Sequence, residues 1–165
     1  MEIKSRIENF EEESRFKIRN QTFTNKIDLD QYIEWNALAG RIFVDCTFQE
    51  LDLLGKVFGS CDFKNCQFTN CKFENCQIVN CDLTRAEFGY SSFRNSQFLN
   101  SDLRASDFMA CEFRKTTFKN SNLELILAWD VKLWESNQLT EIEKSSNFAN
   151  ILKDMNLISS DEGYS

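Results

Sequence analysis

The stretch from Cys61 to Asn75 reads CDFKN CQFTN CKFEN and repeats one five-residue pattern three times. Each pentad begins with a small residue, carries a large apolar residue in the third position and ends with asparagine. The large apolar position continues in both directions, from Phe43 to Leu123, through 17 pentads of which 12 carry phenylalanine. A period of five matches neither the 3.6 residues of an α-helix nor the alternation of a strand. It indicates internal repetition, which decides the architecture.

Two further registers accompany the large residues. All seven cysteines stand two residues before a large apolar position, and alanine, serine or threonine takes this place in other pentads. Asparagine is frequent two residues after it. These registers fit a chain that turns a corner every five residues, so that four pentads close a square turn of twenty. Large residues would fill the inside, small residues the tight inner wall and asparagines the corners. Successive turns would stack about 4.8 Å apart through parallel backbone hydrogen bonds.

Segments 61–65, 71–75 and 101–105 resemble the A(D/N)LXX motif of the pentapeptide-repeat family. The resemblance covers residues 41–125, about half of the chain. It implies an all-β fold, the right-handed quadrilateral parallel β-helix of that family. The expected structural core consists of Phe63, Phe68, Phe73, Ile78, Leu83, Phe88, Phe93, Phe98, Leu103, Phe108, Phe113 and Phe118.

Both ends of such a solenoid expose an apolar cross-section and need a cap. Residues 1–40 are expected to form a partly helical N-terminal cap. Within it, Ile3, Ile7 and Phe10 share one helical face, and a second helix is expected to contain Leu29, Ile33 and Trp35 before Gly40. The β-helix of about four turns would occupy residues 41–125. Arg41 and Lys56 stand at inward positions that otherwise hold small residues, which predicts an irregular first turn.

Beyond the repeats, residues 126–158 are expected to hold the last partial turn and a C-terminal capping helix. The pentad phase continues weakly through Ile126, Ala128, Val131 and Leu133. Phe148, Ile151, Leu152 and Met155 then follow at helical spacing, with an N-cap expected within residues 145–147. Residues 159–165 are expected to be a flexible tail.

The composition argues against an enzyme. Histidine is absent, which removes the commonest general base and metal ligand. Glycine-rich phosphate loops and nucleophile elbows are also absent, so we expect no catalytic residue, cofactor or metal site. The cysteines are interpreted as small buried residues and free thiols. Asp62, Asp82 and Asp102 would stack in a ladder that is open to water, so a structural role is favoured over a catalytic one.

The expected location is the cytoplasm of a bacterial cell. Residues 1–10, MEIKSRIENF, lack the apolar core of a signal peptide, and no stretch approaches 18 apolar residues. In the cytosol the thiols would remain reduced. The net charge of −7, from 26 acidic and 19 basic residues, argues against direct nucleic-acid or membrane binding.

These exclusions leave a non-catalytic protein-binding module, and the four sides of the solenoid differ in what they would present. Side one carries Asp62, Asp82 and Asp102 with Lys64 and Arg104. Side two carries Gln67, Thr69, Glu87, Asp107 and Met109. Side three carries Lys72, Glu74, Arg94, Glu112 and Arg114, a mixed-charge surface interpreted as solvated. Side four, the candidate interaction side, carries Gln77, Val79, Gln97, Leu99, Thr117 and Lys119.

Side four is the one that charged residues avoid, and interface centres are depleted of charge. Val79 and Leu99 would stack there as an apolar strip. Two alternatives remain open at this point: two exposed apolar residues without a role, or a terminal segment that folds back over them. Trp129 and Trp134 are a second candidate contact, for a partner or for an end-to-end homodimer, or else a cover for the last turn. A monomer is equally compatible with the sequence.

The family resemblance also implies an alternative function. Its best-understood members imitate a DNA duplex and protect type II topoisomerases such as DNA gyrase. Charge mimicry of DNA requires dense negative charge. Residues 41–125, however, hold 11 acidic and 10 basic residues, a net charge of −1. Protection of a topoisomerase is therefore kept as the second hypothesis, in which shape rather than charge would serve.

Overall fold

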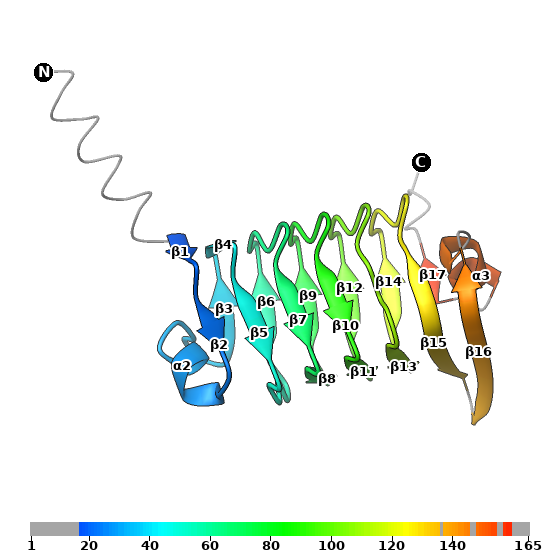
Figure 1. Ribbon diagram of the computed structural model, residues 1–165, viewed down its shortest axis with the longest axis horizontal. Coiled ribbons are helices and arrows are strands. Elements are labelled where there is room, and N and C mark those ends of the chain that lie inside the picture. The colour runs from blue at the N-terminus through cyan, green and yellow to red at the C-terminus, as the bar shows by residue number, and fades with distance from the viewer. Residues whose placement is uncertain (1–16, 136, 146–147, 155–156, 160–165) are drawn as a thin grey trace, which may run out of the picture.

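The structure is a computed structural model that describes residues 17–135, 137–145, 148–154 and 157–159 (Figure 1). In these residues the chain winds into a parallel β-solenoid of about five turns. Each turn has four sides, and from the second turn on a strand pairs in parallel with the residues twenty positions further along. The predicted all-β solenoid with square turns is confirmed.

The strands follow one another along the four sides. Side one contains β1 (Lys17–Arg19) and β4 (Ile42–Val44), and isolated bridges extend it through Asp62, Asp82, Asp102 and Asn122. Side two contains β2 (Thr22–Phe23), β5 (Thr47–Gln49), β7 (Gln67–Thr69) and β10 (Glu87–Gly89). Side three contains β8 (Lys72–Glu74), β11 (Ser92–Arg94), β13 (Glu112–Arg114), β15 (Ala128–Glu135) and β16 (Gln138–Ser145). Side four contains β3 (Ala37–Ala39), β6 (Val57–Gly59), β9 (Gln77–Val79), β12 (Gln97–Leu99), β14 (Thr117–Lys119) and β17 (Ile158–Ser159).

The large apolar residues fill the solenoid, and all twelve predicted core residues are buried. Rings that are twenty residues apart stack face to face. Phe93, for example, lies 4.7 Å from Phe73 and 5.0 Å from Phe113 between ring centroids, each time with 9° between the ring planes. Rings on adjacent sides meet edge to face, as Phe88 and Phe93 do. Both arrangements are favourable for aromatic pairs.

The small-residue register lies against the inner wall, as predicted. Ser96 Oγ donates a 2.9 Å hydrogen bond to Phe73 O of the turn below and accepts one of 3.0 Å from Cys76 N. A larger side chain would push these backbones apart. The corner register has positive φ throughout, near +53° at Asn70 and +54° at Asn75. Asparagine tolerates this left-handed conformation better than most residues, which explains its frequency there.

The N-terminal expectation needs correction, because the solenoid begins at Lys17 instead of residue 41. β1 and β2 pair with β4 and β5 at an offset of 25 residues, so the first turn is five residues longer than the others. This extra length holds α2 (Lys26–Asp30), which is capped by the Asn25 side chain. The additional turn raises the total from the expected four to about five.

The helix expected around Leu29, Ile33 and Trp35 is therefore misplaced. Leu29 is buried in α2, but Trp35 is fully exposed at a corner with φ +50°, and the strand β3 follows. The chain leaves the helix early because positions 37–39 return to the pentad phase with Leu38 buried. The helix expected to contain Ile3, Ile7 and Phe10 lies outside the described residues.

Lys56 points inward, as its register predicted, and remains fully covered by the first turn. Its side chain is 8% exposed, its Nζ donates a 2.9 Å hydrogen bond to Asn36 Oδ1, and Asp30 Oδ1 lies 3.5 Å away. The first turn thus supplies the partners that a buried ammonium needs: Asp30 at the end of α2 and Asn36 just before β3.

At the C-terminal end the chain forms a feature that the sequence did not predict. β15 continues the stack on side three and then turns back at Asn137 (φ +71°) into the antiparallel β16. The expected capping helix is present as α3 (Phe148–Asp154), where Phe148 and Leu152 are buried. The Phe148 ring lies 5.9 Å from Phe113, so α3 covers the last complete turn. Residues 146–147, Met155 and 160–165 lie outside the described part.

Candidate interaction surface

Side four is built from strands in strict register, so its outward residues form two columns. Val79 stacks on Leu99 and Leu99 on Lys119, while Gln77, Gln97 and Thr117 form the parallel column. Val79 and Leu99 are half-exposed, since the inward Ile78 and Phe98 take the buried positions. The structure brings all six predicted residues of this side together on one face.

The apolar strip is longer than the sequence suggested. Ala37 and Val57 precede Gln77 in one column, and Ala39 and Gly59 precede Val79 in the other. On the side-four strands β3, β6, β9 and β12, none of the outward residues is charged. The open alternative of a terminal segment lying over the strip is not seen in the described residues: β17 instead pairs edge to edge with β14 and lengthens the sheet.

Trp35 lies two residues before β3, at the corner where side four begins, and its side chain is 100% exposed. Its spacing with Leu29 and Ile33 predicted a helix, so Trp35 was not expected as a surface residue of side four. The signal was present in the numbering, because position 35 shares the corner register of residues 55, 75, 95 and 115. A fully exposed tryptophan beside an uncharged face is a typical anchor for a protein partner.

Trp129 and Trp134 are both on β15, but neither covers the end of the solenoid. Trp129 is 44% exposed, and Trp134 is half-buried on side three, where the Arg114 guanidinium carbon lies 5.6 Å from its ring centroid. The interpretation of these residues as a cover for the last turn is wrong, because Phe148 and Leu152 of α3 fill that place. Their role in an end-to-end homodimer stays a prediction.

The cysteines do not form a reactive or metal-binding cluster in the described part of the chain, where no three His, Cys, Asp or Glu residues converge. All seven are free and buried. Burial raises the pKa of the Cys66 thiol to about 12 and those of Cys71 and Cys76 to about 11. Such thiols are poor nucleophiles and poor ligands, because the thiolate is the reactive form.

The aspartate ladder of side one stabilises turns. Oδ1 of Asp62, Asp82 and Asp102 accepts a hydrogen bond from the backbone N–H two residues later in each case. Hydrogen bonds from Arg104 lower the pKa of Asp102. Burial alone would raise the pKa of Asp82, but hydrogen bonds from Thr84 and Lys64 lower it instead. The lowered pKa values of Asp82 and Asp102 are the opposite of the raised pKa that a general acid needs.

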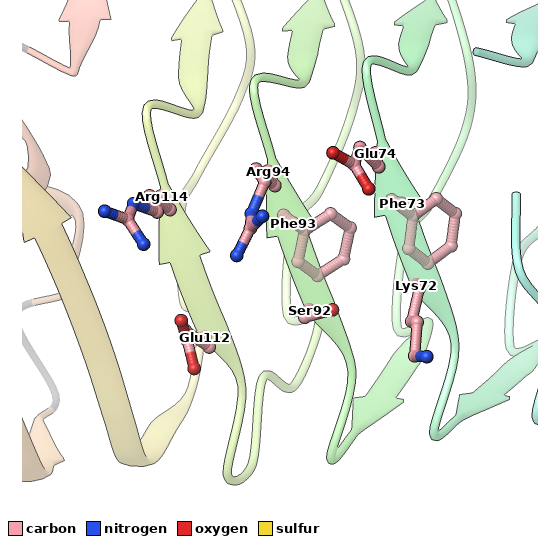
Figure 2. A pocket seen from close by; sticks show the side chains of 8 residues that line it. All are labelled: Lys72, Phe73, Glu74, Ser92, Phe93, Arg94, Glu112 and Arg114. Atoms are coloured by element: carbon pink, nitrogen blue, oxygen red, sulfur yellow. The ribbon is translucent and has the colours of Figure 1, made fainter. Parts of the chain in front are cut away.

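Side three has a hollow of about 330 Å³, shown in Figure 2. It opens over β8, β11 and β13 and is lined by both acidic and basic side chains. The mixed charges of these residues predicted a solvated surface, and the hollow was not expected. A shorter residue, Ser92, stands between Lys72 and Glu112 in the same column and creates the space.

In the part of the chain that the structure describes, no helix is long and apolar enough to cross a bilayer.

Comparison with known proteins agrees with this geometry. Residues 57–126 match the family model of the pentapeptide repeat region. Two structures of QnrB1, a plasmid-mediated fluoroquinolone resistance protein, are 20% and 22% identical in sequence, with TM-scores of 0.57 and 0.52. They cover 67% and 66% of this chain, which spans 55% and 56% of theirs. The pentapeptide repeat protein AT2G44920 from the Arabidopsis thaliana thylakoid lumen is 20% identical, with a TM-score of 0.56, over 61% of this chain and 70% of its own.

At these identities the likeness concerns the fold alone. The chain spans just over half of the length of the QnrB1 structures. The search of curated proteins finds no match.

Proposed function

Because this chain is a pentapeptide-repeat protein, we propose that it is a non-catalytic module that binds another protein through side four. The observation that carries the proposal is the uncharged strip of Ala39, Gly59, Val79 and Leu99, with Trp35 fully exposed at its border. The backbone beneath it is fixed by parallel pairing on both edges of each inner strand, so little conformational entropy would be lost on binding. The cytoplasm is the proposed location, where buried thiols stay reduced.

The test compares the wild type with a Val79→Glu, Leu99→Glu variant in affinity capture from a bacterial lysate, followed by titration with the purified partner. The matched control is Thr69→Glu, Gly89→Glu on side two, because Thr69 and Gly89 occupy the same register on adjacent strands. A Cβ added at Gly89 meets no atom within 4 Å, so the control is expected to fold. We expect the wild type and the control to retain the same partner and the side-four variant to lose it.

A partner that is retained or lost equally by both variants would overturn the assignment to side four. Capture of no protein by the wild type would count against the binding module itself. The contact is expected to be only weakly salt-dependent, because apolar burial does not depend on charge screening.

Protection of a type II topoisomerase is the second candidate, favoured by the likeness in fold to QnrB1. The nearly neutral solenoid argues against charge mimicry, as only 11 acidic residues oppose 10 basic ones between positions 41 and 125. A gyrase supercoiling assay with a quinolone distinguishes the two functions. Protection by the wild type and by both variants would replace the side-four proposal with this one.

A further inference from the structure

Side three places two arginines directly beside each other. Arg94 of β11 and Arg114 of β13 are register partners, and Figure 2 shows both side chains at the hollow, with the Arg114 guanidinium turned away from Arg94. Adjacent strands are about 4.8 Å apart, and like charges directly opposite destabilise a sheet. Among the described residues, neither guanidinium lies within ion-pair distance of a carboxylate, although Glu74 is the other register partner of Arg94. In this part of the chain both arginines therefore lack a carboxylate at ion-pair distance, although Glu74 and Glu112 border the same hollow.

Trp134 packs beside this pair. It is the register partner of Arg114 on β15, and the Arg114 guanidinium carbon lies 5.6 Å from its ring centroid. The Trp134 Nε1 atom is buried and has no hydrogen-bond partner in the described residues. An indole N–H can only donate, and buried ones normally have an acceptor. Asn137 Oδ1 accepts a 3.5 Å hydrogen bond from Arg114 Nη2, so within the described residues the cluster has an amide acceptor and no carboxylate at ion-pair distance.

The hollow gives an acceptor room to approach. Ser92 stands two residues before Arg94 on the same strand, and its short side chain leaves about 330 Å³ open between Lys72 and Glu112. Glu74 and Glu112 border the hollow. These two carboxylates would repel an extended polyanion such as a nucleic acid, while leaving space for one isolated negative group.

We infer that side three binds a carboxylate of an acidic peptide segment, held between Arg94 and Arg114 beside the Trp134 indole. The planar guanidinium fork matches the two oxygens of an aspartate or glutamate side chain, and charge-assisted bonds of this kind are the strong ones. Because β11 and β13 lie on a different face from the uncharged strip, the site does not depend on the role of side four.

The test is an NMR titration of the full chain that follows the Arg Nε–Hε signals and the Trp134 indole N–H. The probe is a blocked Gly/Ser peptide with one central glutamate, and its counterpart carries glutamine instead. We expect saturable shifts with the glutamate peptide and at least tenfold weaker binding of the glutamine peptide. Arg94→Gln and Arg114→Gln are each expected to weaken binding about tenfold, the equivalent of about 1.4 kcal/mol.

The matched control is Arg104→Gln. Arg104 stands in the same outward register on side one, where it already pairs with Asp102 at 2.6 Å, and its removal should leave binding unchanged. Equal binding of the two peptides, or unchanged binding in both arginine variants, would overturn the site. Inorganic phosphate is the second arm: binding of phosphate without any preference for the glutamate peptide would overturn the assignment to a peptide carboxylate.

A structural role of the arginines would appear in stability. Without ligand and at low salt, Arg94→Gln is expected to unfold at the same temperature as the wild type or a higher one, since it removes repulsion. A lower unfolding temperature would assign Arg94 to fold stabilisation and would contradict the binding site. Circular dichroism reports this for each variant before the titration.

Discussion

Lys56 Nζ donates a hydrogen bond to Asn36 Oδ1 across one turn of the solenoid, and this 2.9 Å contact joins the long first turn to the second. The lysine is 7% exposed, so its ammonium depends on Asn36 and on Asp30, 3.5 Å away, to replace water. The contact explains how a cationic residue occupies a position that other turns give to cysteine, serine or threonine.

Replacement of Asn36 should therefore reduce stability more than its exposed position suggests. We expect Asn36→Ala to lower the free energy of unfolding by about 1–3 kcal/mol, because it removes the hydrogen bond of a buried charged group. Lys56→Ser should be tolerated better, since serine fills the same register at position 96 with satisfied hydrogen bonds. Urea denaturation measures both, and an Asn36→Ala variant as stable as the wild type would contradict this account.

Ring stacking predicts that a core phenylalanine inside the solenoid contributes more than one at its end. Phe88 stacks on Phe68 at 4.9 Å and on Phe108 at 4.8 Å, whereas the terminal Phe23 stacks only on Phe48 at 4.9 Å. We expect Phe88→Ala to cost about 3–5 kcal/mol and Phe23→Ala clearly less. The same denaturation experiment compares them, and the reverse order would show that stacking between turns is not what limits stability.

The corner at Leu125 offers a stabilising substitution. Leu125 has φ +57° and is 80% exposed, so its left-handed backbone is sterically strained and its side chain gains no burial in return. Leu125→Gly should raise the unfolding free energy by about 1 kcal/mol, because glycine adopts this conformation without steric strain. Leu127→Gly is the control: Leu127 is 45% exposed but has ordinary φ, and there glycine should destabilise. Equal effects at the two positions would argue against corner strain.

Thiol burial predicts a loss of stability in alkali. Cys66, with a pKa near 12, and Cys71 and Cys76, with pKa values near 11, titrate near 9 when the chain is unfolded. Above pH 9 the unfolded chain loses these protons first, so the stabilisation present below pH 9 falls as the pH rises toward 11–12. The urea midpoint should decline more steeply over this window in the wild type than in a Cys66→Ala, Cys71→Ala, Cys76→Ala variant. Parallel declines would show that the thiols titrate normally in the folded protein.

The repeat register predicted the core, the corners and the composition of each side. This was possible because every pentad forms one side of a turn, so each of its five positions has the same environment throughout the solenoid. It did not predict the first turn. Ile18, Phe23 and Leu38 share the phase of Phe43, but Asp28 interrupts the series where α2 replaces a strand. The β15–β16 hairpin was missed for a different reason: its pairing is antiparallel, so the five-residue period carries no information about it.

The candidate site was predicted only in part. Val79 and Leu99 follow from the register, and so does the column in which Arg94 and Arg114 meet. The hollow depends on the difference in size between Ser92 and its neighbours, and the donor cluster depends on where β15 places Trp134. Side-chain volumes and the path of the last turn had to be seen in three dimensions.

The twenty-residue register also determines which changes of length this protein can accept. Deletion of residues 62–81 would shorten the solenoid by one turn and leave every later residue on its present side. Deletion of five residues would rotate everything that follows by a quarter turn, and Leu99 would move from side four to side three. The longer first turn avoids that rotation, because the segment with α2 loops out and returns with Ala37 still paired to Val57. Lineages of such a protein can therefore gain or lose whole turns while their faces stay aligned.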